Sequence, residues 1–209
     1  LRLVGSEMCI RDSCGDADAG YYVSSTGQSS QTACSAGSYQ AYSGQTSCDT
    51  ADAGYYVSST AQTSQTACTI GTFSSSKGSV LCTDAPAGYY VSFTGQSIAT
   101  ACNAGSYQAD SGQTSCDAAD IGSYVSTVGQ STQTACPNGT STIATGSNSA
   151  TQCFSDFDND AVVDIYDSDD DNDDVLDVND AFPLDASESV DLDGDGIGNN
   201  ADTDDDGDG

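Results

Sequence analysis

Histidine and tryptophan are absent from the chain, and lysine and arginine together supply only three of its 209 residues. Without histidine the chain lacks the commonest general base and a frequent zinc ligand. Against these three cations stand 32 acidic residues, so the net charge is −29. A potential of that sign repels phosphate backbones and anionic headgroups, and it attracts cations. We therefore expect no nucleic-acid binding.

Long apolar runs are also missing. None approaches the roughly 20 residues needed to span a bilayer, so we expect no membrane insertion. The chain has no glycine-rich phosphate loop and no histidine to activate a nucleophile, and we therefore expect that it is not an enzyme.

The chain is poor in leucine and isoleucine but contains ten cysteines. No close Cys-x-x-Cys pair occurs, which disfavours zinc. The cysteines instead predict a disulfide framework, which forms in an oxidising compartment. We expect the protein to be extracellular or at the cell surface.

The first thirteen residues differ from the rest. Residues 3–13, LVGSEMCIRDS, resemble the translation of a transposase-based sequencing-library adapter. The resemblance implies that residues 1–13, with Cys9 and both arginines, are an artefact and should be left out of fold reasoning. Because the sequence also stops inside a motif, we expect it to be an internal piece of a longer protein.

A strict repeat organises residues 14–153. Glycine recurs every 17 residues from Gly20 to Gly139, and cysteine recurs with double that period. The units are rich in Gly, Ser, Thr and Gln with tyrosine pairs, which excludes helical repeats of similar length. Each half-unit predicts a short hairpin with a turn at a second glycine. Hairpins this small need disulfides, and we expect the tyrosines to cover these and the neighbouring units.

The pattern resembles the ephrin-receptor-like and TNF-receptor-like cysteine-rich repeats. Units of that family follow Cys-x-x-Cys-x-x-Gly-x-Tyr and end in Gly-Gln-x-x-Cys. The resemblance implies tandem disulfide-rich hairpins. This chain departs from it because cysteines six and three residues before the glycine alternate, as Cys14 and Cys34 do. Half of the family's cysteines are therefore absent, which we expect to be the loss of whole disulfides.

Two cysteine connectivities are open. Pairing each cysteine with the next from Cys14 onward, as Cys14–Cys34 and Cys48–Cys68, would leave Cys153 without a partner. The other pairing leaves only Cys14 unpaired, with a partner upstream, and we predict this second set. Its pairs are Cys34–Cys48, Cys68–Cys82, Cys102–Cys116 and Cys136–Cys153.

Residues 154–209 contain 22 acidic residues and no basic one. A plain acidic run would be a solvated tail. Here the acidic residues instead recur as D-x-D-x-D-x-x-x-D-x-x-D. The three complete copies are Asp156, Asp158, Asp160, Asp164 and Asp167; Asp169, Asp171, Asp173, Asp177 and Asp180; and Asp191, Asp193, Asp195, Asn199 and Asp202, while Asp204, Asp206 and Asp208 begin a fourth.

This spacing suits a hard cation. Calcium takes six to eight oxygen ligands, and side chains at positions 1, 3, 5, 9 and 12 with a backbone carbonyl at position 7 can surround one ion. Position 7 is Val162, Val175 or Ile197, whose side chain can point inward while the backbone carbonyl coordinates. We therefore predict Ca²⁺ as the cofactor, with loops that open without it.

Residues 156–209, with their closely spaced loops and the run at residues 193–209, resemble thrombospondin type 3 repeats of bacterial surface proteins. That resemblance implies an irregular rod wrapped around calcium ions, with the ligands given above. Gly196 keeps the glycine expected at position 6, but Ala161 and Asp174 replace it, which predicts looser first and second loops.

The predicted fold class is a set of small disulfide-rich β repeats, tandem short hairpins in an elongated array, followed by an irregular calcium-wrapped rod with essentially no helix. Its domains are residues 14–153 and 154–209. The function we expect is that of a calcium-binding stalk or spacer in a larger secreted or surface adhesion protein. The alternative is a binding module whose tyrosine-rich repeats recognise a protein or glycan partner.

Overall fold

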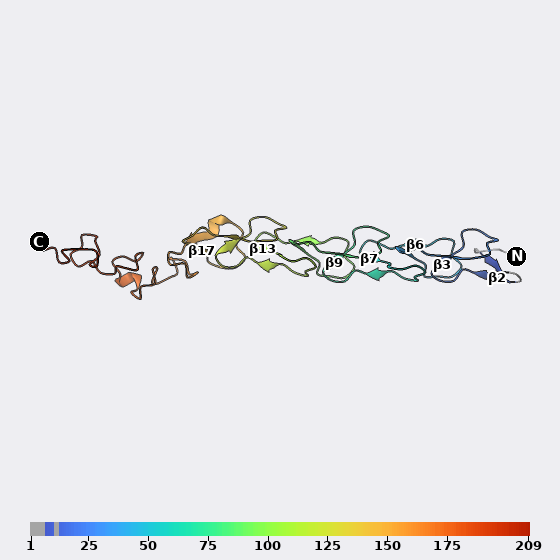
Figure 1. Cartoon of the computed structure of the whole chain (residues 1–209), viewed down its shortest axis with the longest axis horizontal. Helices are drawn as coiled ribbons and strands as arrows, with labels where there is room; N and C mark the ends of the chain where they lie inside the picture. Colours follow the sequence, from blue (N-terminus) through green and yellow to red (C-terminus); the bar gives the residue numbers. More distant parts are fainter. Residues whose placement is uncertain (1–6, 11–12) are drawn as a thin grey trace. The chain divides into compact units, whose positions relative to one another are not determined.

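The computed structural model describes residues 7–10 and 13–209, with side chains from Gly15 onward. The chain divides into two compact units. The first comprises Leu1–Cys102 and Gln108–Cys116, and the second comprises Asn103–Tyr107 and Asp117–Gly209. Both contain small hairpins that succeed one another along the sequence, and the second also contains the aspartate-rich tail (Figure 1).

Every sheet in the described part is an antiparallel pair of short strands. In β3–β4, for example, Tyr21 lies opposite Ala33 and Tyr22 opposite Thr32. The strands pair in chain order and are β1 (Glu7–Ile10), β2 (Ser13–Asp16), β3 (Tyr21–Tyr22), β4 (Thr32–Ala33), β5 (Ser38–Tyr39), β6 (Asp49–Thr50), β7 (Tyr55–Tyr56), β8 (Thr66–Ala67), β9 (Thr72–Phe73), β10 (Thr83–Asp84), β11 (Tyr89–Tyr90), β12 (Thr100–Ala101), β13 (Ser106–Tyr107), β14 (Asp117–Ala118), β15 (Ser123–Tyr124), β16 (Thr134–Ala135), β17 (Thr140–Thr142) and β18 (Cys153–Ser155).

Helix is almost absent. Within the described residues it is confined to the 3-10 turns η1 (Ala150–Gln152) and η2 (Asp177–Asn179). No helix there has the length and apolar character that crossing a membrane requires. The predicted class of small disulfide-rich β repeats is confirmed.

Four disulfides in the described part each close one hairpin, namely β5–β6, β9–β10, β13–β14 and β17–β18. They join Cys34 to Cys48, Cys68 to Cys82, Cys102 to Cys116 and Cys136 to Cys153. These are the four pairs that we predicted from the ends of the array. The side chain of Cys14 lies outside the described residues, and so does the prediction of an upstream partner for it.

A small residue, three positions before a hairpin's first glycine, forms the narrow core. Alanine and cysteine alternate at this position, and both are fully buried from Ala17 to Ala119. The buried residues are Ala17, Cys34, Ala51, Cys68, Ala85, Cys102 and Ala119, each with 0% of its surface exposed. Alanine therefore fills the space of the missing cysteines without leaving an unpaired thiol.

The position that would hold the second missing cysteine is used differently. Gln65 accepts a hydrogen bond from the Asp52 backbone N–H at 2.7 Å through its side-chain oxygen, and its amide nitrogen donates to the Asp52 carboxylate at 3.0 Å. The same two bonds join Gln31 to Asp18 and Gln133 to Asp120. We call this pair of bonds the Gln–Asp clip. It links the two ends of a hairpin where the neighbouring hairpins have a disulfide.

Among the hairpins from β3 to β18, one has neither closure. Pro86 replaces the aspartate and Ala99 replaces the glutamine. Proline has no backbone N–H to donate, so the glutamine would have lost half of its role there. Once proline removes the donor, a glutamine at position 99 has less to bind, which agrees with the presence of Ala99.

The 17-residue glycine period has a steric cause. Gly54 has a φ of +86°, and a Cβ on it would lie 2.1 Å from the carbonyl oxygen of Gly95, two hairpins further along the chain. Its N–H also donates to the Ser74 carbonyl of the next hairpin at 2.8 Å. This glycine is thus pressed between neighbouring hairpins, where a side chain has no space.

This close approach predicts unequal effects of alanine at two glycines. Gly54→Ala should lower the free energy of unfolding by about 1–3 kcal/mol more than Gly27→Ala, because it adds overpacking to backbone strain. Gly27 has a similar φ of +80° but no atom within 4 Å of a built Cβ. Denaturant unfolding of the two variants measures the difference, and equal losses would contradict the packing argument.

Candidate metal centre

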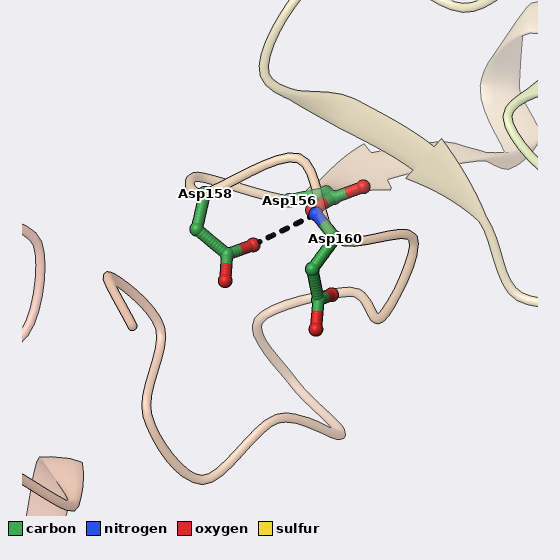
Figure 2. A group of neighbouring side chains, drawn as sticks. All are labelled: Asp156, Asp158 and Asp160. Carbon is green, nitrogen blue, oxygen red and sulfur yellow. Dashed lines mark hydrogen bonds between the residues drawn. The ribbon is translucent and has the colours of Figure 1, made fainter. Parts of the chain in front are cut away.

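Three aspartates on one turn of chain form each candidate site. We name the segments loop 1 (156–167), loop 2 (169–180), loop 3 (191–202) and loop 4 (204–209). In each, positions 1, 3 and 5 offer carboxylate oxygens that lie within 4.8 Å of one another. Figure 2 shows the set of loop 1, Asp156, Asp158 and Asp160, in which the Asp160 backbone N–H donates to Asp158 at 3.0 Å.

The backbone reaches this arrangement through left-handed residues at positions 4 and 6. In loop 1 these are Asn159 at φ +63° and Ala161 at +78°, and in loop 2 they are Asn172 at +57° and Asp174 at +72°. Loops 3 and 4 have glycine at both positions. Loops 1 and 2 therefore make the same turns as loop 3, although they lack the glycine whose absence predicted looser loops.

Position 9 closes each complete loop in the same register. Its backbone N–H donates to the carbonyl of the residue before position 1, as from Asp164 to Ser155 at 3.0 Å. Its side-chain oxygen accepts from the N–H of position 2, as Asp164 does from Phe157 at 2.9 Å. Asp177 and Asn199 make the equivalent pairs of bonds.

Position 12 accepts a hydrogen bond from the backbone that follows each complete loop. Asp167, Asp180 and Asp202 each accept a hydrogen bond from the backbone N–H two residues on. These carboxylates are outside the triplets whose oxygens lie within 4.8 Å. The structure thus assembles positions 1, 3 and 5 directly, while positions 9 and 12 hold the backbone.

Two of the three position-7 side chains point toward solvent. Val162 is 41% exposed and Ile197 is 47% exposed, and Val175 is half-buried. In loop 1 the following residue, Val163, takes the inward place and is only 2% exposed. The position-7 N–H donates to the position-5 aspartate, as from Val162 to Asp160 at 2.7 Å.

Two of the predicted ligands are buried acids with an unused oxygen. Asp156 is 3% exposed and Asp171 is 6% exposed. Among the described residues, Asp156 Oδ1 and Asp171 Oδ2 are buried atoms without a hydrogen-bond partner. A buried unpaired carboxylate oxygen is unfavourable, and a bound cation would remove that cost. The donor set and the orphaned oxygens therefore fit a metal ion.

The pKa values of two triplet aspartates are raised, as expected for carboxylates that lie close together and are partly buried. Burial, followed by repulsion from Asp173, raises the pKa of Asp171 above its ordinary value. Burial also raises the pKa of Asp158, with further contributions from Asp160 and Asp167. Both carboxylates are less easily ionised than in water because they are packed together.

Sequence reasoning missed Asp170 and Glu188, which lie outside the repeated spacing. Burial and the charges of Asp177 and Asp164 raise the pKa of Asp170 to about 6. Glu188 is 8% exposed and accepts a hydrogen bond from the Asn200 backbone N–H at 2.9 Å. Its carboxylate fills the space over Gly198, where a Cβ would meet it. The only sequence feature that distinguished Glu188 is that it is the single glutamate in residues 154–209.

No protein-family model and no curated protein matches the chain. The class of protein is therefore defined by the fold and the site. It is a disulfide-linked β-hairpin repeat protein with aspartate triplets that can hold metal ions.

Relieving the backbone strain in loop 1 should tighten cation binding. Ala161→Gly removes a cost of about 1–2 kcal/mol for a left-handed alanine, partly offset by the chain entropy of glycine. We expect a several-fold lower dissociation constant for loop 1, and Gly196→Ala should weaken loop 3 similarly. Calorimetric titration of both variants measures this, and an unchanged affinity in both would contradict the strain argument.

Proposed function

We propose that the chain is a calcium-binding structural spacer of the extracellular space or the cell surface. The observation that carries this proposal is the set of four aspartate triplets, each with ligand oxygens within 4.8 Å of one another. Carboxylates this close repel one another, so a bound cation that neutralises them would stabilise each loop.

The donor chemistry favours calcium among the common cations. The triplets contain only carboxylate oxygens, with no histidine or cysteine. Oxygen-only sites suit hard cations, and flexible loops with several carboxylates suit calcium better than the smaller, strictly octahedral magnesium. Loops 1 to 3 would each bind through positions 1, 3, 5, 9 and 12 and the carbonyl at position 7.

The hairpins supply the structural part of the proposal. Their repeated fit and their disulfides give a stable series with little internal space, as expected of a spacer in an oxidising compartment. The resemblances to cysteine-rich receptor repeats and to thrombospondin type 3 repeats agree with such a role and with a non-enzymatic protein.

The alternative, a binding module, is favoured by one observation. The units around β9 to β12 replace consensus serines by apolar residues: Leu81 is 63% exposed, Phe93 is 70% and Ile98 is 68%. Leu81 also lines a small hollow with Tyr56 and Thr72 beside Cys82. A protein or glycan partner would contact these residues. Weaker binding of a partner by Leu81→Ser with Phe93→Ser, and not by Ser47→Ala, would support this role.

A matched pair of variants tests the calcium site. Asp193→Asn removes the central carboxylate of the loop 3 triplet, and Asp205→Asn removes an equal charge from an exposed residue outside the triplets. We expect the first to weaken one site by about tenfold or more, because ligand charge sets affinity, and the second to leave the affinities unchanged. Equal effects in calorimetry would mean that calcium merely screens the acidic tail.

A further inference from the structure

The glycine that opens each hairpin meets the next hairpin through its N–H. In the second unit the Gly105 N–H donates to the Val125 carbonyl at 2.8 Å, twenty residues later. At Gly122 the acceptor is the Thr142 hydroxyl, again twenty residues later, at 3.0 Å. Both glycines thus find their hydrogen-bond acceptor in the hairpin that comes next along the chain.

In the described residues no hairpin follows β17–β18, yet the pattern continues. The Gly139 N–H donates to the side-chain oxygen of Asn159 at 3.1 Å, which is also twenty residues later. The Gly139 carbonyl accepts from the Asp156 N–H at 3.0 Å. Both backbone groups of Gly139 are therefore satisfied by loop 1.

The surroundings of Gly139 show that packing stops here. A Cβ on Gly105 would lie 2.3 Å from the Gly146 carbonyl oxygen, whereas none of the described atoms lies within 4 Å of a Cβ on Gly139. A repeat series needs a terminal element that satisfies its last unit. Loop 1 takes that position through the Asn159 hydrogen bond, whereas the bond from Asp156 has a counterpart at each earlier hairpin, as from the Cys136 N–H to the Gly122 carbonyl.

We propose that loop 1 is the terminal cap of the hairpin series and that cation binding in loop 1 stabilises the last hairpin, Gly139–Ser155. The coupling rests on the proposed calcium site, while the cap does not. Asp156 is both a member of the metal triplet and the donor to Gly139, and Asn159 lies between the triplet members Asp158 and Asp160. An ion that fixes the triplet therefore fixes both contacts, and ligand binding to the closed form stabilises the hairpin that this form contacts.

Asn159 is specific to this role. It occupies position 4 with φ +63°, a conformation that asparagine tolerates better than most residues. Gly194 holds the same position in loop 3 with φ +78°, so the turn itself needs no side chain. Asn172, the counterpart in loop 2, contacts Asp158 and not a hairpin.

Asn159→Gly and Asn159→Asp in the full chain test the proposal. The first keeps the turn and removes the acceptor, and the second keeps an acceptor oxygen. NMR amide exchange is followed at Gly139 and in β17–β18, with and without calcium. In the native chain calcium should raise the protection of these amides, whereas Asn159→Gly should lower Gly139 protection by about tenfold, the effect of one hydrogen bond, and abolish the calcium increment. In the calcium-free chain Asn159→Asp should keep the native protection of Gly139, because its carboxylate oxygen still accepts the hydrogen bond.

The outcomes separate the two claims. Unchanged Gly139 protection in calcium-free Asn159→Gly would overturn the cap. Calorimetric calcium binding without any change of protection in residues 139–155 would overturn the coupling alone. Absence of calcium binding by calorimetry would overturn the proposed function and the coupling together, while the calcium-free comparison still decides the cap.

Discussion

Removing calcium with a chelator is expected to open residues 156–209 while hairpins β3–β16 stay folded. Two like charges about 4 Å apart repel by about 4 kcal/mol near a protein surface, and each loop holds three such carboxylates. An ion present at a hundred times its dissociation constant offsets this with about 2.7 kcal/mol per loop, which corresponds to about a hundredfold in amide protection. Hydrogen exchange followed by mass spectrometry resolves the two segments.

The control is magnesium at the same ionic strength. It should restore little of the tail's protection, because it meets these flexible loops less well than calcium does. Tail protection that is the same with calcium and with chelator would contradict the account.

Removing one disulfide should destabilise far more than removing one Gln–Asp clip. For the double variant Cys68→Ala with Cys82→Ala we expect a loss of about 3 kcal/mol, from the unfolded-state entropy of a loop of about 15 residues. Packing should change little, because Ala85 and Ala99 already occupy the equivalent positions in a later hairpin. Gln65→Ala should cost about 1 kcal/mol, the usual net effect of a hydrogen bond.

Denaturant unfolding of these two variants provides the comparison. The hairpin with Pro86 and Ala99 is the same in both variants and has neither a disulfide nor a clip. Its amides should therefore exchange fastest in the series and serve as an internal reference. A disulfide variant no less stable than Gln65→Ala would show that the crosslinks are dispensable.

Much of the hairpin series was predictable because the repeat constrains it. The glycine period, the hairpins and the four disulfide pairs all follow from spacing and from the need to pair cysteines. The Gln–Asp clip was not predicted, since it joins residues 13 apart whose proximity only the folded hairpin shows. Its signal was present in the sequence: aspartate and glutamine occur together in three units and are replaced together at Pro86 and Ala99.

The tail was predictable in its triplets and less so in its details. Positions 1, 3 and 5 are close in sequence, so their convergence needs only one turn of chain. The exposure of the Val162 and Ile197 side chains at position 7 was not predicted. The link from Asn159 to Gly139 depends on where loop 1 meets the last hairpin, which no local pattern reveals.

Calorimetric titration of calcium into the intact oxidised chain tests the central claim most directly. The account predicts saturable binding of about three ions, one for each complete loop, with any further binding due to the fourth triplet. It also predicts much weaker heats with magnesium. The absence of saturable binding at millimolar calcium would contradict it and would leave the aspartate-rich tail as a solvated acidic segment.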